Sequence, residues 1–278
     1  MQINIITCQR ILNISILDSL YNAFIRLYAN YAVHLTCIYF SANDKEEVSN
    51  RSLSPQIRII SEESFFGASL YIKIVSFKSV YESVHNHSFG WFVQQLIKLY
   101  SPQFFGHDIL IFDSDTLPMK KLRTFISPEV LPFYYERNSR YSPLCAEIFG
   151  FPGSLFTKYI AQHMYFSQKN ITQLAKQVNN HSLSLYDNWI INLTAICSSS
   201  SVLVLSEYEL YAFCLNYSLE CAFVTQKVRL IRHGTVIEAC LGKRFALLIY
   251  KLLRIDLVAY ESWSKRIHLL EPFKYVFN

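Results

Sequence analysis

Two aspartates separated by one residue, Asp113 and Asp115, are the side chains of this sequence best placed to do chemistry. They directly follow Ile109–Phe112, an unbroken apolar run that is typical of a strand buried in a parallel sheet. Ligands of α/β sheets bind beyond the carboxyl ends of strands, and residues i and i+2 of an extended backbone face the same way. The two carboxylates are therefore predicted to converge on an Mg²⁺ or Mn²⁺ ion that they share with substrate phosphates.

A D-x-D triplet by itself is compatible with three interpretations. It can be a turn in which one aspartate caps the next element. It can belong to a haloacid-dehalogenase-type phosphatase with Asp113 as the covalent nucleophile, although Leu117 stands where that class has Thr or Val. It can also hold the metal and the donor diphosphate of a nucleotide-sugar glycosyltransferase, where the ion neutralises charge on the leaving group. The position in mid-chain, after several strand–helix units, favours the third interpretation.

Two further stretches accompany this triplet. The segment 90–99 reads G-W-x-x-Q-Q-x-x-K-L, and the segment 206–211 reads S-E-Y-E-L-Y. Together with D-S-D they resemble a bacterial family of GT-A-fold glycosyltransferase-like proteins from surface polysaccharide loci. The resemblance implies sugar transfer from a nucleotide-diphosphate donor to a capsule or lipopolysaccharide glycan, or to a lipid-linked acceptor. It also implies Mn²⁺ or Mg²⁺ as the cofactor, held by Asp113, Asp115 and His233.

The first of these stretches is predicted to form a helix with a polar face. Its Trp, two Gln and Lys are spaced i, i+3, i+4 and i+7, which places them close together on a helix. The glutamine amides can hydrogen-bond sugar or base edges, and the lysine can meet a phosphate as a point charge. A solvated polar stripe, with the Trp in the core, would give the same spacing. The predicted donor-binding residues are Trp91, Gln94, Gln95, Lys98, Asp113, Ser114 and Asp115.

The second stretch offers candidates for a general base. An inverting transferase needs a carboxylate to take the proton from the acceptor hydroxyl, and Glu207 and Glu209 are the candidates, with Asp187 in reserve. Ser206 and Glu209 also fit an S-x-x-E capping box at the start of a helix. In that case Glu209 is structural and Glu207 is freer to face the site. In a retaining enzyme these carboxylates would only position sugar hydroxyls.

The elements that must position these residues alternate between strand and helix. The predicted strands are Met1–Cys8, His34–Phe40, Ile57–Ile60, Asp108–Phe112 and Val130–Tyr135. The predicted helices are Ile14–Val33, Ser88–Tyr100 (ending before Pro102), Leu155–Phe166, Thr172–Asn179 and Tyr186–Cys197. This order predicts an α/β fold, a GT-A-like Rossmann-type mixed sheet flanked by helices, with a mostly helical C-terminal part. We expect one continuous domain: a nucleotide-sugar-binding half, 1–150, and a helical acceptor-side half with a basic tail, 151–278.

Composition and charge narrow the class of protein. The 278 residues are 51% hydrophobic and 17% charged, which excludes a disordered or low-complexity chain. The net charge of +5 is concentrated in residues 225–278, which hold ten Lys and Arg residues and four acidic ones. Such a tail is either a solvated basic face or a contact for a membrane surface or a diphosphate, the latter through Arg229, Arg232 or Lys243. Nucleic acid is not expected, because the basic residues alternate with large apolar ones.

Within this tail, Phe245–Tyr260 is apolar but interrupted by charges, too polar for a membrane span. It is predicted to be an amphipathic helix that either lies on a membrane or faces the core. A non-catalytic polysaccharide-locus protein that binds a membrane through this tail is thus the alternative to an enzyme. Seven cysteines without a C-x-x-C pair predict buried, reduced thiols. We therefore expect a cytoplasmic protein, located at the inner face of the membrane if the tail binds lipid.

Overall fold

The structure is a computed structural model, and it describes the chain in eight stretches to which all structural statements below refer. These are residues 2–9, 13–39, 54–133, 141–150, 162–181, 186–218, 224–232 and 234–260.

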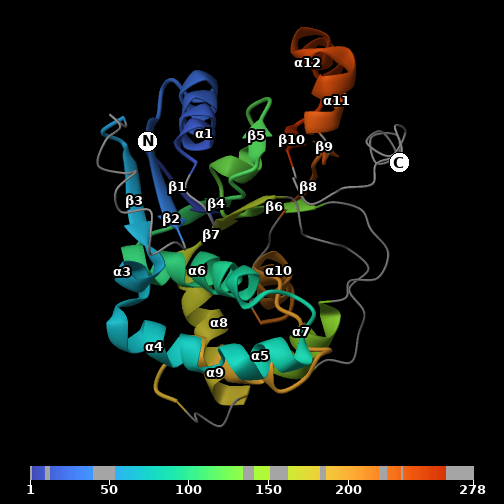
Figure 1. Ribbon diagram of the computed structural model, residues 1–278. Coiled ribbons are helices and arrows are strands. Elements are labelled where there is room, and N and C mark those ends of the chain that lie inside the picture. Colours follow the sequence, from blue (N-terminus) through green and yellow to red (C-terminus); the bar gives the residue numbers. More distant parts are fainter. Residues whose placement is uncertain are drawn as a thin grey trace.

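A five-stranded sheet in the order β3-β2-β1-β4-β7 forms the centre of the molecule (Figure 1). β1 pairs in parallel with β2 and β4, β2 pairs in parallel with β3, and the edge strand β7 runs antiparallel to β4. The mixed sheet with helices on both faces confirms the predicted fold class. The strands are β1 (Gln2–Gln9), β2 (Ala32–Tyr39), β3 (Ile57–Ser61), β4 (Ile109–Phe112) and β7 (His163–Phe166).

The order in which strands are added to the sheet changes direction between β1 and β4. After β1 the chain adds β2 and β3 on one side, and it then returns to place β4 on the other side of β1. Such a topological switch point leaves a crevice beyond the carboxyl ends of the two strands, where open α/β sheets bind ligands. The D-S-D segment begins at this crevice, because it directly follows β4.

The four residues of β4 point alternately to the two faces of the sheet and are all fully buried. Leu110 and Phe112 join the core beneath α1 (Ile14–Leu27). The other two β4 residues join a larger core beneath α6 (Phe89–Phe105). Burial on both faces explains the unbroken apolar run, and the same alternation directs Asp113, the next residue, toward the α6 side.

Helix α6 begins at the Ser88 cap, whose hydroxyl accepts a hydrogen bond from the backbone N–H of Trp91 (3.3 Å). It ends at Gly106, which takes the left-handed conformation (φ 72°). The prediction that it ends before Pro102 was wrong. Pro102 has no N–H and therefore removes one helical hydrogen bond, yet the helix continues to Phe105. The carbonyl of Pro102 still accepts a hydrogen bond from the N–H of Gly106 (3.0 Å).

Seven further helices contribute to the core on the α6 side of the sheet. The predicted helices 172–179 and 186–197 correspond to α8 and α9. The predicted helix Leu155–Phe166 was wrong, because residues 163–166 form β7 and pair with β4, while residues 155–161 lie outside the described stretches. The helices are α3 (Glu62–Phe66), α4 (Ala68–Ser76), α5 (Lys78–Val84), α7 (Ser142–Phe149), α8 (Gln168–His181), α9 (Trp189–Ser198) and α10 (Glu207–Ser218).

Two small sheets and a helical pair complete the described chain, and most of its described residues after 150 are helical, as predicted. The sheets have the orders β5-β10-β9 and β6-β8. Helices α11 and α12 stand above the first of them, away from the central sheet (Figure 1). The elements are β5 (Thr116–Pro118), a 3₁₀ turn (Arg123–Phe125), β6 (Val130–Phe133), β8 (Val224–Lys227), β9 (Leu230–Ile231), α11 (Gly234–Leu241), α12 (Lys243–Leu252) and β10 (Leu257–Ala259).

The predicted amphipathic segment 245–260 is therefore only partly helical. It is helical to Leu252, and its residues 257–259 pair with β5 and β9 instead. Six cysteines lie in the described stretches and all are thiols; five are buried, as predicted, whereas Cys240 is exposed. In the same stretches, no helix combines the length and the apolar character that crossing a bilayer requires.

Candidate functional site

The D-S-D segment forms a tight turn between β4 and β5. The backbone N–H of Thr116 donates a hydrogen bond to the carbonyl of Asp113 (3.1 Å), which closes the turn. We expected the two carboxylates to converge because residues i and i+2 of an extended backbone face the same way. The backbone turns here instead, so that argument does not apply. Asp113 contacts α6 and α10, whereas Asp115 lines a pocket beside α1.

Asp113 belongs to a cluster of four side chains, Lys98, Asp113, Glu207 and Tyr208, which we call the Lys98 cluster. The Lys98 ammonium donates hydrogen bonds to Asp113 Oδ1 (2.5 Å) and to Glu207 Oε1 (2.7 Å). The Tyr208 hydroxyl donates a third to Asp113 Oδ1 (3.1 Å). The side chains of Lys98 and Glu207 are only 7% and 2% exposed. The cluster thus ties the D-S-D turn to α6 and α10.

Burial and charge act against each other in this cluster. Burial disfavours the Lys98 charge, but the carboxylates of Asp113 and Glu207 outweigh it and hold the pKa of Lys98 well above its usual value. Burial also raises the pKa of Glu207, and the nearby Lys98 only partly offsets this. The pKa of Tyr208 is raised by burial and by the Asp113 charge. Lys98 is therefore a charged donor, and Tyr208 keeps the proton that it donates to Asp113.

The start of α10 explains how the second motif reaches this cluster. The Ser206 hydroxyl accepts a hydrogen bond from the N–H of Glu209 (3.5 Å), and its carbonyl accepts one from the N–H of Leu210 (2.9 Å). Ser206 thus caps α10, as the S-x-x-E pattern predicts. Glu207 occupies the first turn, where the helix dipole favours an acidic side chain. Glu209 is fully buried.

Lys98 is the member of the 90–99 motif that the structure brings to the D-S-D turn. The Gln95 amide donates to the carbonyl of Trp91 in its own helix (3.2 Å). The half-buried Trp91 ring lies 4.9 Å from that of His87 and packs against the core. Gln94 is half-buried, and neither glutamine lines the pocket described next. The donor-binding role of these three residues stays a prediction.

A pocket of about 640 Å³ lies beside the turn and along α1. It brings together α1, the D-S-D turn, β5, the α11–α12 pair and the residue that follows β10. Two of the predicted donor-binding residues, Ser114 and Asp115, are among its lining residues. The pocket is lined by Ile16, Ser19, Asn22, Ala23, Arg26, Ser114, Asp115, Leu117, Pro118, Met119, Glu238, Lys243, Leu247 and Tyr260.

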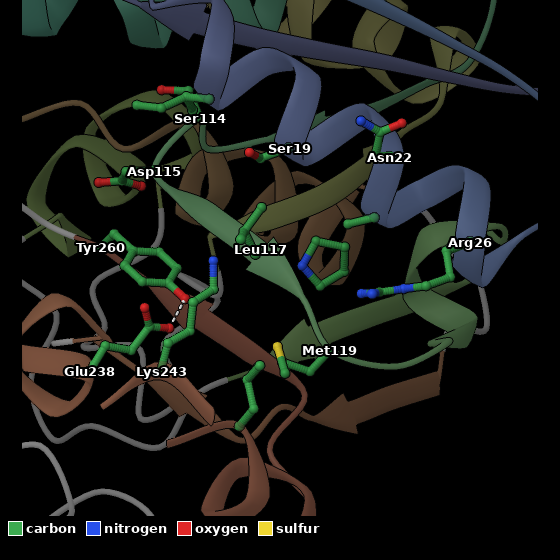
Figure 2. Close-up of a pocket in the computed structure, with 14 residues that line it drawn as sticks. Ser19, Asn22, Arg26, Ser114, Asp115, Leu117, Met119, Glu238, Lys243 and Tyr260 are labelled. Carbon is green, nitrogen blue, oxygen red and sulfur yellow. Dashed lines mark hydrogen bonds between the residues drawn. The ribbon is translucent and has the colours of Figure 1, made fainter. Parts of the chain in front are cut away.

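Charged side chains of both signs line this pocket. Asp115, Tyr260 and Glu238 follow one another along one wall, and Arg26 and Lys243 extend into the pocket from α1 and α12 (Figure 2). The Tyr260 hydroxyl donates a hydrogen bond to Glu238 (2.5 Å), and burial together with this carboxylate raises the pKa of Tyr260. The Tyr260 N–H donates to the Asp115 carbonyl (2.7 Å), which joins the end of β10 to the turn.

Some of the residues that line the pocket were predicted from the sequence and others were missed. Lys243 was named as a candidate phosphate contact, and it does line the pocket. Arg229, named with it, instead donates to the carbonyl of Leu253 (3.2 Å). Arg26 and Glu238 were not singled out, because each is an ordinary charged residue of an amphipathic helix with no motif around it.

A strained residue supports the turn from β7. Gln162 has φ 62°, in the left-handed region that non-glycine residues seldom adopt. Its carbonyl accepts the N–H of Asp113 (2.9 Å), and its side-chain oxygen accepts the Thr116 hydroxyl (3.4 Å). These two hydrogen bonds tie the D-S-D turn to the residue that precedes β7.

The described residues contain no group of three His, Cys, Asp or Glu side chains that could hold a metal ion. The predicted third ligand, His233, lies outside the described residues. Mg²⁺ is commonly bound by one or two carboxylates together with substrate phosphates, so a full protein cage is not required. Asp115, which lines the pocket, fits that kind of site.

Comparisons with known proteins give a family model and distant structural likenesses. Residues 2–129 match the model of a family of unknown function, DUF6492. No curated protein matches the sequence. The apo form of mouse xyloside xylosyltransferase 1 is similar to this chain at 11% identity and TM-score 0.45, over 96% of this chain and 100% of that one. The galactosyltransferase LgtC with donor and acceptor sugar analogs is similar at 10% identity and TM-score 0.45, over 97% and 90%.

Proposed function

We propose that this chain is a metal-dependent glycosyltransferase that takes its sugar from a nucleotide-diphosphate donor. The observation that carries the proposal is the pocket beside the D-S-D turn, which Asp115 lines together with the cations Arg26 and Lys243. Its volume of about 640 Å³ is within the usual range for small-molecule sites. A carboxylate for a metal ion and cations for phosphate groups, in one pocket, suit a nucleotide diphosphate.

The phosphates would be held by the two cations. Arg26 offers a planar fork of N–H donors that can bind phosphate oxygens in pairs, and Lys243 acts as a point charge. Ser19, Asn22 and Ser114 add neutral hydrogen-bonding groups to the lining. These groups suit the hydroxyls of the sugar and the ribose.

Asp115 would hold Mg²⁺ or Mn²⁺ together with the donor phosphates. When bound, the ion supplies positive charge that stabilises the nucleotide diphosphate as it leaves. Asp113 Oδ1 already accepts hydrogen bonds from Lys98 and Tyr208, so we assign Asp113 mainly to positioning the turn. His233 remains a predicted third ligand.

Lys98 and Glu207 are proposed as positioning residues. Glu207 accepts a hydrogen bond from Lys98, and Lys98 donates another to the Asp113 carboxylate. Asp113 begins the D-S-D turn, so this chain of contacts would fix the position of Asp115 at the pocket. Glu207 and Glu209 are buried and do not line the pocket. We therefore assign neither of them a proton transfer, although both were predicted as candidate bases.

The alternatives fit the geometry less well. A phosphatase would need Asp113 to attack a phosphoester, yet its Oδ1 is bound to Lys98 and Tyr208 and it does not line the pocket. The acceptor, a capsule, lipopolysaccharide or lipid-linked glycan, rests on the resemblance of the three motifs alone. The cytoplasmic location stays a prediction.

A thermal-shift assay against nucleoside diphosphates and nucleotide sugars, with and without Mn²⁺, tests the proposal. A ligand that binds the native state alone stabilises it by about 2.7 kcal/mol at a hundred times its Kd. We expect a metal-dependent rise in Tm with one nucleotide, lost in Asp115→Asn and reduced in Arg26→Ala. The matched controls are Asp18→Asn, on the same helix as Arg26 but outside the pocket lining, and Lys73→Ala on α4.

Two outcomes would contradict the proposal. One is a well-folded protein whose Tm no nucleotide raises, which would favour the non-catalytic alternative. The other is a nucleotide effect that Asp115→Asn leaves intact, which would move the donor site elsewhere. Release of phosphate from a small phosphoester, lost in Asp113→Asn, would instead favour the phosphatase.

A further inference from the structure

We propose that α12 docks on an anionic lipid surface through an exposed apolar stripe. The stripe consists of Phe245, Leu248 and Leu252, which are 54%, 50% and 71% exposed. Large apolar side chains that share one exposed face indicate an interaction site, whereas scattered ones do not.

The geometry of α12 separates this stripe from the buried side of the helix. At about 100° per residue, the three stripe residues fall within a narrow sector of the helix surface. Ala246 and Tyr250, on another face, are fully buried in a small core with β9 and β10. The helix is thus held to the protein by one face and presents a second apolar face to the exterior.

The charge around the stripe identifies its partner as an anionic surface. Residues 239–255 contain four cations and no acidic residue, and these cations are exposed: Lys243, Arg244, Lys251 and Arg254. On a helix, Arg244 and Lys251 border the stripe on one side. Apolar side chains beside Lys and Arg are the pattern of a helix that lies in the interface of an anionic membrane.

A second copy of this chain fits the stripe less well. In a symmetric dimer the same surface of each copy meets the other, so both copies would bring the cations beside their stripes into one interface. Like charges in contact oppose association, whereas anionic headgroups would neutralise them. The charges therefore favour lipid over self-association.

The location of α12 gives this docking a consequence for the pocket. The helix stands away from the central sheet (Figure 1), and its Lys243 and Leu247 line the pocket from another face. Docking would hold the pocket near the headgroups, where a lipid-linked acceptor would be presented. This consequence rests on the proposed function, but the docking itself does not.

Cosedimentation of the full chain with vesicles tests the proposal without any measurement of transfer. The vesicles are phosphatidylcholine alone, or phosphatidylcholine in which part is replaced by phosphatidylglycerol. We expect binding to the anionic vesicles only, and weaker binding at higher salt. A chain that does not bind these vesicles could still bind a nucleotide, so either proposal can be refuted without the other.

Three variants locate the contact. Phe245→Ser/Leu248→Ser/Leu252→Ser should reduce vesicle binding more than tenfold, because it removes the apolar contact. Arg244→Gln/Lys251→Gln should reduce it roughly thirtyfold, since each cation near an anionic membrane is worth about 1 kcal/mol. The control Ile72→Ser/Val80→Ser changes exposed apolar residues of α4 and α5 and should leave binding unchanged.

Three results would overturn the proposal. The first is absence of binding to anionic vesicles, or binding that the stripe variant leaves intact. The second is a wild-type oligomer, seen by light scattering, that the stripe variant dissociates, which would assign the stripe to a second copy. The third is a clear loss of Tm in the stripe variant, which would show that another part of this chain covers it.

Discussion

Replacing Lys98 with Met removes the cation that lies between the carboxylates of Asp113 and Glu207, while keeping most of the apolar stem. The Lys98 and Glu207 side chains are 7% and 2% exposed, so water can replace little of the lost interaction. Removing one partner of a buried ion pair typically costs about 3–5 kcal/mol. Because native proteins are stable by about 5–15 kcal/mol, we expect a folded but clearly weakened variant.

The pH dependence of this loss follows from the direction of the pKa shifts. In the native protein, burial already raises the pKa of Glu207, and Lys98 opposes that rise. Without Lys98 the folded-state pKa of Glu207 rises further above the unfolded value. The native variant then binds more protons than the unfolded chain as the pH falls. Its free energy of unfolding should recover in part from neutral to mildly acidic pH and be lowest at alkaline pH.

Urea denaturation of both proteins at a series of pH values measures this loss. Lys120→Met is the matched control, because Lys120 also pairs with a buried carboxylate, that of Asp256, but is 47% exposed. Because Lys120 is half-exposed, water can take the place of its ammonium beside Asp256, so we expect a smaller loss than for Lys98→Met. A Lys98→Met loss no larger than that of the control, and constant with pH, would refute a buried charge cluster. Partial rescue by Lys98→Met/Glu207→Gln would support it.

Two backbone predictions accompany this one. Gln162→Val should lower the free energy of unfolding by about 1–3 kcal/mol, since a β-branched residue is strained at φ 62°. Gln162→Gly also loses the hydrogen bond from the Thr116 hydroxyl, but glycine adopts this φ freely, so it should destabilise the protein less than Gln162→Val; equal losses in the two variants would exclude strain at this position. Gly234→Ala should cost about 1–3 kcal/mol, because the added Cβ would lie 2.5 Å from a side-chain carbon of β10. Gly90→Ala has open space around its Cβ and should not destabilise the protein, and chemical denaturation of the pair compares them.

The parts of the fold that depend on local patterns were predictable. The apolar run 109–112 indicated a buried strand, and β4 is fully buried on both faces. The S-x-x-E pattern at Ser206 indicated the start of α10, which begins at Glu207. The helical spacing of 172–179 and 186–197 indicated α8 and α9. Each of these signals comes from residues that are close together in the sequence.

Two of the errors have identifiable causes. Pro102 was taken as a helix end because a proline removes a helical hydrogen bond, but α6 continues past it to Phe105. Residues 163–166 combine aromatic and apolar residues in a run too short to show a period. Their pairing with β4, more than fifty positions earlier in the chain, decided that they form a strand.

The sequence by itself determined the alternation of strands and helices, the delivery of the D-S-D segment to the end of a buried strand, and the concentration of positive charge near the C-terminus. Only the tertiary structure decided what the two aspartates contact. Lys98 and Glu207 are separated by 109 positions, and their ion pair depends on how α6 and α10 pack. The pocket likewise exists because β10 pairs with β5 and brings α12 beside α1. Local periodicity reports on neighbours a few residues apart, whereas such contacts depend on the packing of elements that are distant in the sequence.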